Sequence, residues 1–142
     1  MSQPLWQPSA DRIAASQLTK FTEQVNQQHQ QELTDFTSLY HWSIAEPAKF
    51  WQQIWDFGGV KASQPATEIL LNPEQMLGAE WFVGAKLNFA ENLLKFNDDR
   101  PAIIEVKESG EKLRLSHAQL YQEVARLAAA LKKSGVTAGD RV

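Results

Sequence analysis

Residues 102–135 read AIIEVKESGEKLRLSHAQLYQEVARLAAALKKSG, and this stretch decides the fold of the second half of the chain. A β-rich run, 102–106, and an alternating polar and apolar run, 112–115, flank the turn-forming segment Glu-Ser-Gly-Glu. That arrangement predicts a β-hairpin. Ser116 and Gln119 have the spacing of a capping box, which begins a helix. We therefore predict strand, strand and helix, in that order.

The predicted helix is amphipathic. Its apolar side chains recur at i, i+4, i+7, i+8 and i+11, namely Leu120, Val124, Leu127, Ala128 and Leu131. Lys132 and Lys133 suit the negative end of the helix dipole, and Gly135 suits a left-handed cap. We expect this stripe, and the strands near residues 103 and 113, to be only partly covered. The isolated chain should then expose apolar surface and self-associate.

The first 97 residues are predicted to be mainly helical. Ser9 is a suitable N-cap for a helical pattern that runs to the glutamine-rich stretch after Val25, with a break near Ser16. Asp35 is predicted to cap a second helix. Pro47 fits the first turn of a third, which Gly58-Gly59 would end.

Residues 60–86 have no clear period. Ile69-Leu70-Leu71 predicts a short strand, and Pro73 is expected to begin a single helical turn. Asn88 and Glu91 have cap-box spacing and predict a helix from Phe89 to Lys95. These assignments connect the helical region to the hairpin described above.

Composition changes at the polar segment around residues 96–101. Of 14 aromatic residues, 13 lie at or before Phe96 and only Tyr121 lies after it. We predict a helical region over 1–97 and a second region over 98–142, which gives an α+β fold class. Gly139 to Val142 reads like a turn that enters another strand, so we expect the chain to be the front piece of a longer protein.

The composition excludes several classes of function. The 142 residues include no cysteine, so disulfide scaffolds, thiol catalysis and cysteine zinc sites are excluded. A balance of 14 basic and 17 acidic residues argues against nucleic-acid binding, which needs a basic face. No apolar run is long enough to span a membrane, and the first residues do not resemble a secretory signal. We predict a cytoplasmic location.

The histidines and the one pair of adjacent aspartates do not have the spacing of a site. His29, His41 and His117 are separated by 12 and 76 residues, which matches no helical metal pair. We interpret them as structural histidines. Asp98 and Asp99 are neighbours in a polar loop, so we expect them to face solvent rather than to form a catalytic carboxylate pair.

The aromatic and arginine candidates have equally plain interpretations. Trp51 and Trp55 lie one helical turn apart and could stack on an adenine, but aromatic residues at this spacing usually fill a core. Arg100, Arg114 and Arg126 are scattered, so a phosphate site is not indicated. We assign no catalytic, cofactor-binding or metal-binding residue to this chain.

Two stretches carry a family resemblance. Residues 42–57, with Trp42-Ser43-Ile44-Ala45-Glu46, Phe50-Trp51 and Trp55-Asp56-Phe57, and residues 81–94, WFVGAKLNFAENLL, resemble the N-terminal region of acyl-CoA synthetases that act on acetate or acetoacetate. Leu39-Tyr40-His41-Trp42-Ser43 and the run from Gly84 fit the acetoacetate-using members. Residues 100–142 resemble the opening of the AMP-binding domain of adenylate-forming enzymes, which would make this part a truncated α/β domain.

The resemblance implies an AMP-forming ligase. Acetoacetate and ATP, with Mg²⁺, would give acetoacetyl-adenylate and pyrophosphate, and CoA would then displace AMP. In the family the phosphate-binding loop lies beyond the position of Val142, so this piece is expected to be structural, catalytically silent and partnered by the rest of its own chain. The product would belong to ketone-body and lipid metabolism.

Two alternatives remain open at the level of sequence. The first is a sister enzyme, an acetyl- or propionyl-CoA synthetase. The second belongs to another class of protein: a stand-alone helical module that binds a protein partner through its aromatic surface.

Overall fold

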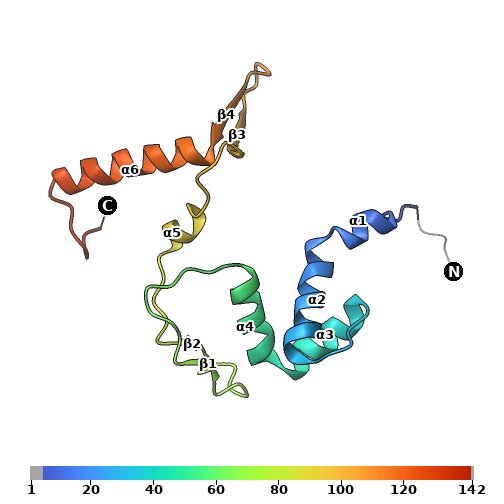
Figure 1. Ribbon diagram of the computed structural model, residues 1–142. Coiled ribbons are helices and arrows are strands. Elements are labelled where there is room, and N and C mark those ends of the chain that lie inside the picture. The colour runs from blue at the N-terminus through green and yellow to red at the C-terminus, as the bar shows by residue number, and fades with distance from the viewer. Residues whose placement is uncertain (1–4, 142) are drawn as a thin grey trace. The chain divides into compact units, whose positions relative to one another are not determined.

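The computed structural model describes residues 5–141, which form six helices and two antiparallel hairpins (Figure 1). The predicted α+β class is confirmed. The chain divides into two compact units, residues 1–86 and 87–142, and each is described by itself. The compositional boundary between residues 97 and 98 stays a prediction about domain organisation.

The first unit contains four helices and one hairpin: α1 (Ala10–Ala14), α2 (Gln17–His29), α3 (Phe36–Ala45), α4 (Pro47–Phe57), β1 (Glu68–Leu71) and β2 (Glu80–Val83). The second unit contains α5 (Phe89–Leu93), β3 (Pro101–Val106), β4 (Lys112–Ser116) and α6 (His117–Lys133).

Helices α1, α3 and α4 of the first unit begin where their predicted caps and the proline lie. Ser9 accepts the Arg12 N–H at the start of α1, which ends at Ala14. Ser16 caps α2 by accepting the Thr19 N–H, so the predicted break is confirmed. The Asp35 carboxylate accepts the Ser38 N–H at 2.7 Å at the start of α3. Pro47 occupies the first turn of α4. These caps satisfy backbone groups that have no partner inside a helix.

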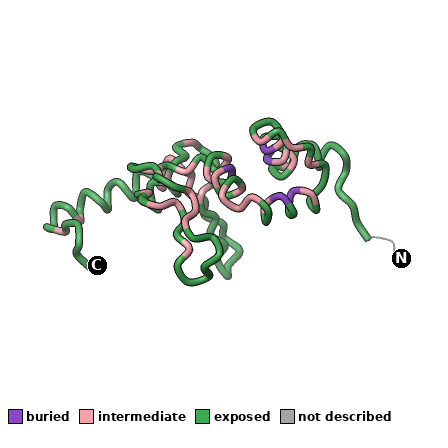
Figure 2. Tube along the Cα trace, turned by 90° about the horizontal axis from the view of Figure 1, so that it is seen from below, coloured by how far each residue is buried: buried purple, intermediate pink, exposed green. Residues whose placement is uncertain are grey.

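The core of the first unit lies between α2 and α3, with α4 against it. Phe21, Val25, Leu39 and Trp42 are buried, and Leu33, Phe50 and Phe57 pack on them. The Phe21 ring meets the Phe50 and Phe57 rings edge-to-face, at centroid distances of 5.9 and 5.3 Å. Within the described chain, Figure 2 shows buried positions only on these helices.

The hairpin of the first unit pairs β1 with β2, and Leu70 lies opposite Trp81. β1 confirms the predicted strand, whereas β2 was not predicted. The expected helical turn at Pro73 is wrong, because the Gln75 N–H donates to the Asn72 carbonyl in a tight turn. Asn72, with a φ of 54°, and Gly78, with a φ of 122°, reverse the chain there and return it along β1.

The second unit begins with the short helix α5. It ends at Leu93 instead of the predicted Lys95, and Asn88 caps it by accepting the Glu91 N–H at 3.1 Å. β3 and β4 then form the predicted hairpin, with Ile104 opposite Arg114. Its turn is closed by a hydrogen bond from the Gly110 N–H to the Lys107 carbonyl.

Helix α6 has the predicted capping at both ends. The Ser116 hydroxyl accepts the Gln119 N–H at 3.2 Å, and the Gln119 side chain accepts the Ser116 N–H at 2.9 Å. Past the other end, Gly135 adopts a φ of 88°, and the Val136 N–H donates to the Leu131 carbonyl. The capping box and the left-handed glycine are therefore confirmed.

Candidate functional site

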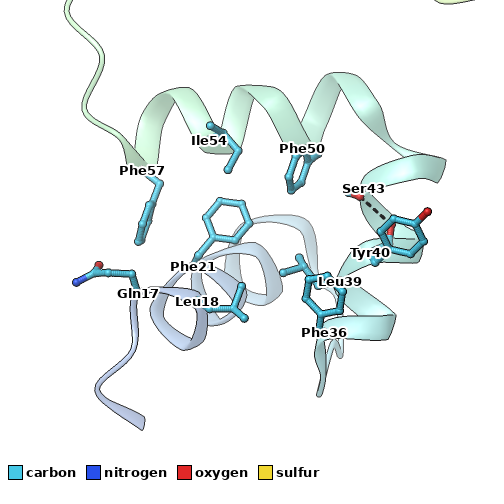
Figure 3. A pocket seen from close by; sticks show the side chains of 10 residues that line it. All are labelled: Gln17, Leu18, Phe21, Phe36, Leu39, Tyr40, Ser43, Phe50, Ile54 and Phe57. Atoms are coloured by element: carbon cyan, nitrogen blue, oxygen red, sulfur yellow. Dashed lines mark hydrogen bonds between the residues drawn. The ribbon is translucent and has the colours of Figure 1, made fainter. Parts of the chain in front are cut away.

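An open groove with a volume of about 390 Å³ lies between the helices of the first unit. Figure 3 shows side chains of α2, α3 and α4 facing one another across it. The lining is almost wholly apolar and consists of Gln17, Leu18, Phe21, Phe36, Leu39, Tyr40, Ser43, Phe50, Ile54 and Phe57.

The groove lacks the groups that acid–base or nucleophilic chemistry requires. Its lining includes no carboxylate, histidine or basic side chain. The Ser43 hydroxyl donates to the Tyr40 carbonyl at 2.7 Å, so it is engaged with its own helix (Figure 3). Apolar walls of this kind bind apolar surface. The groove therefore offers apolar surface and no group for acid–base chemistry.

The three histidines lie on three different helices. His29 ends α2 and packs 5.2 Å from Trp42, His41 lies on α3 next to Tyr40, and His117 begins α6, 5.4 Å from Phe96. Over residues 5–141, no group of three or more histidine, aspartate or glutamate side chains is placed to hold a metal ion. Each histidine instead contacts an aromatic ring.

Asp98 and Asp99 do not act as a carboxylate pair. The Asp98 carboxylate accepts from the Arg100 Nε at 2.9 Å and from its Nη2 at 2.7 Å. These hydrogen bonds lower the pKa of Asp98 below its ordinary value, and the same contact raises the pKa of Arg100. Asp98 is thus a partner for Arg100, and its side chain is 42% exposed, in agreement with the expected solvent-facing loop.

The prediction that Trp51 and Trp55 fill the core is wrong. Phe50 and Phe57 face the core of α2 and α3, whereas the two tryptophans lie on a different face of α4. The Trp51 ring contacts Trp81 and the Trp55 ring contacts Phe82, so both cover the β1–β2 hairpin. The unpredicted strand β2 explains this difference. The paired aromatic residues Trp81-Phe82 were the sequence signal that could have revealed it.

The arginines do not converge on a phosphate site. Arg100 pairs with Asp98, and Arg126 pairs with Glu123 at 2.7 Å on the same helix. Arg114 lies on β4 opposite Ile104. Such exposed pairs between near neighbours are local and contribute little to stability.

The second unit exposes an apolar face. Ile103 and Leu113 on the hairpin are exposed, and so are Val124 and Leu127 on α6. Leu120 and Leu131, at the two ends of the stripe, are half-buried. The predicted partial covering of this stripe is confirmed by these exposures. Across the described residues, the helices are too short or too polar to cross a membrane.

Comparison with known proteins shows which proteins this chain resembles. Residues 36–93 match the family described as acetyl-coenzyme A synthetase N-terminus. The chain is 35% identical to an acetoacetyl-CoA synthetase of Xenopus tropicalis, over 97% of this chain and 21% of that protein. It is 32% identical to an acetoacetyl-coenzyme A synthetase of Rhizobium meliloti, over 98% of this chain and 21% of that protein.

One further relative has a different name, and another protein supplies a solved structure for comparison. A malonamoyl-CoA synthetase of Penicillium aethiopicum is 32% identical, over 97% of this chain and 20% of that protein. The structure of an acetoacetyl-CoA synthetase from Streptomyces lividans matches with a TM-score of 0.84 and 38% identity, over 99% of this chain and 22% of that one. The chain thus spans about a fifth of the length of these relatives.

Proposed function

Because residues 36–93 match the acetyl-coenzyme A synthetase N-terminus family, we propose that this chain is the N-terminal region of an AMP-forming acetoacetate–CoA ligase. The observation that carries the proposal is the similarity of nearly the whole chain to acetoacetyl-CoA synthetases, in both sequence and fold. The stretches that carry the resemblance, residues 42–57 and 81–94, lie within the matched family segment, residues 36–93, except for Leu94.

The proposed reaction has two steps. The carboxylate of acetoacetate attacks the α-phosphorus of ATP, which gives acetoacetyl-adenylate and releases pyrophosphate. The thiolate of CoA then attacks the acyl carbon, forms the thioester and expels AMP. Adenylation is needed because a carboxylate is a poor electrophile, and AMP is a good leaving group. Mg²⁺ would neutralise charge on the phosphates.

The described residues do not fit a site for ATP and Mg²⁺. Such a site needs cations and backbone N–H groups that converge on phosphates, with oxygen ligands for the metal. The arginines singled out above pair locally or lie apart, and no acidic cluster for a metal is found among residues 5–141. We therefore assign no step of the reaction to a residue of this chain, whose proposed role is architectural.

The proposed architectural role is to dock the exposed apolar surface of the second unit on the rest of the protein. The relatives are about five times as long as this chain, so they contain much sequence that the present residues do not account for. We propose that the AMP-binding domain covers the exposed face of β3, β4 and α6. Leu127 and Ile103 would then become buried, because apolar area of this extent is normally covered.

The test of the activity uses the complete gene product. AMP release is measured with ATP, Mg²⁺ and CoA, and with acetoacetate, acetate, propionate or malonamate as the acid. The proposal expects acetoacetate to give the highest kcat/KM. Preference for acetate or propionate would identify a sister synthetase. Absence of AMP release with every acid would overturn the proposal and favour an interaction module. A cytoplasmic location stays a prediction.

A further inference from the structure

Two aromatic pairs join helix α4 to strand β2. The Trp51 and Trp81 rings meet edge-to-face at a centroid distance of 5.9 Å. The Trp55 and Phe82 rings stack at 4.4 Å with an interplanar angle of 27°. Trp51 and Trp55 lie one turn apart on α4, while Trp81 and Phe82 are consecutive in β2. We call these four residues the aromatic clamp.

Consecutive residues of a regular strand cannot both face the same helix, because side chains alternate between the two faces of a sheet. Both Trp81 and Phe82 nevertheless contact α4. Phe82 has a φ of 49°, which lies in the left-handed region. An aromatic residue adopts this conformation only at a cost in free energy, since its Cβ crowds the backbone. The left-handed residue breaks the alternation.

Hydrogen bonds hold the backbone that follows Phe82, and two of them come from Thr67, the residue before β1. The Phe82 carbonyl accepts the Ala85 N–H at 3.0 Å, and the Val83 carbonyl accepts the Thr67 N–H at 2.9 Å. The Thr67 hydroxyl also reaches the Val83 carbonyl at 3.2 Å. A change of backbone conformation at Phe82 would therefore disturb the pairing of both strands.

We infer that Phe82 is a conformational control point: the ring stack on Trp55 holds its backbone left-handed, and loss of the stack releases the β1–β2 hairpin from α4 as one unit. Strained backbone persists only where surrounding contacts maintain it, and here the Trp55 ring supplies the contact. The hairpin is two-stranded and needs an external surface for stability, which α4 provides. The inference does not depend on the proposed enzymatic activity.

The first test compares alanine with glycine at the same position in the complete gene product. In an ordinary strand, glycine destabilises more than alanine; at a left-handed position the order reverses, because glycine adopts positive φ freely. We expect Phe82→Gly to have an opening constant of the hairpin about fivefold lower than that of Phe82→Ala. At the neighbouring control position, Trp81→Gly should open about two- to fivefold more than Trp81→Ala. The same order at both positions would overturn the inference.

The second test measures hydrogen–deuterium exchange in Trp55→Leu, which keeps an apolar side chain but removes the ring. Peptides covering residues 64–71 and 80–87 should exchange together, roughly three- to tenfold faster than in the unmodified protein. Peptides of α2 and α3 should be unchanged. Tyr121→Leu, a matched change on an exposed helical aromatic of the other unit, should leave the hairpin peptides unaffected.

Each other outcome contradicts the inference. Unchanged exchange in both peptides would show that Trp55 does not hold the hairpin. Faster exchange in residues 80–87 alone would show that the hairpin is not released as a unit. Faster exchange throughout α2 and α3 would show that the clamp is a part of the helical core. Failure of Trp55→Leu to fold would also mean that the hairpin does not release separately, and the comparison at Phe82 would still test the left-handed backbone.

Discussion

The two units differ in how much of their apolar surface they bury. The helical unit buries Phe21, Val25, Leu39 and Trp42 between α2 and α3. In the second unit, no residue that the structure describes is buried, although α6 has a capping box and an amphipathic pattern. The comparison teaches that capping and periodicity specify an element, whereas burial depends on how many other elements surround it.

Two leucines illustrate the difference. Leu39 on α3 is 5% exposed and Leu127 on α6 is 61% exposed, although each belongs to the apolar pattern of its helix. Leu39 lies between α2, α3 and α4. Among the helices and strands that the structure describes, α6 makes its main contacts with the two-stranded hairpin that precedes it. A two-stranded hairpin offers too little surface to bury a helix of 17 residues.

The largest expected effect is the difference in stability between alanine variants of these two leucines. In the 142-residue chain, Leu39→Ala should lower the free energy of unfolding by about 2–5 kcal/mol, because it leaves a cavity in the core. Leu127→Ala should change it by less than about 0.5 kcal/mol. Urea unfolding is followed by tryptophan fluorescence, which reports on the first unit because all five tryptophans lie in it, and by circular dichroism, which reports on the helices of both units. Equal effects of the two variants would contradict the comparison.

Leu127→Ala also tests whether α6 is covered by sequence outside this chain. In the complete gene product, the effect of Leu127→Ala should grow to about 2 kcal/mol or more if the AMP-binding domain buries this side chain. Circular dichroism of the purified protein during urea unfolding measures this change. An effect of Leu127→Ala that is equally small in the chain and in the complete product would count against the proposed docking face.

The next effect concerns association of the isolated chain. Leu127→Glu places a charge on the exposed stripe and should reduce both self-association and binding of an apolar dye severalfold. Gln122→Glu, on the polar side of α6, is the matched control and should leave both unchanged. Sedimentation at several concentrations and dye fluorescence give the two readouts. A chain that is already monomeric and dye-free before substitution would contradict the prediction.

A smaller effect is expected from the cap of α6. Ser116→Ala removes the hydroxyl that accepts the Gln119 N–H and should cost about 1 kcal/mol of helix stability. Ser134→Ala, at the opposite end of the same helix, should have little effect. Thermal unfolding followed by circular dichroism compares the two variants. Similar losses for both would show that the capping box does not stabilise α6.

The smallest effect concerns the Asp98–Arg100 pair and depends on pH. The hydrogen bonds from Arg100 lower the pKa of Asp98 in the folded state below its ordinary value of 3.8. A lowered folded pKa means that the stabilisation is present above the ordinary pKa and is lost as the pH falls through the folded one. Asp98→Asn should therefore destabilise the loop at neutral pH and should lose this effect below about pH 3.8.

Nuclear magnetic resonance of the Phe96 and His117 rings, which lie beside this loop, measures that dependence. Asp99→Asn is the control at the adjacent residue. A difference between Asp98→Asn and the unmodified chain that persists unchanged through acid pH would contradict an ionic origin.

Sequence reasoning predicted the helix starts because a cap is a local feature. Ser9, Asp35 and Ser116 each accept a backbone N–H three residues along the chain. That hydrogen bond needs no distant residue, so four consecutive residue types suffice to predict it. The same local logic placed Gly135 after the end of α6.

The roles of Trp51 and Trp55 could not be predicted in this way. Helical periodicity places Phe50 and Trp51 next to each other on one amphipathic segment and does not say that only Phe50 faces the core. The partner of the tryptophans is β2, about 30 residues further along the chain, and its residue Phe82 has a backbone conformation that strand propensity opposes. A contact between distant segments carries no local signal of its own.

By itself, the sequence determined where most helices and three of the four strands lie, and its aromatic spacing indicated relatives among acyl-CoA synthetases. Only the tertiary structure decided which apolar side chains are buried, how the β1–β2 hairpin is attached to α4, and that the apolar stripe of α6 remains exposed. The physical reason is that hydrogen-bonded caps and turns form between near neighbours. Burial, in contrast, is a property of all the surfaces that meet at one place.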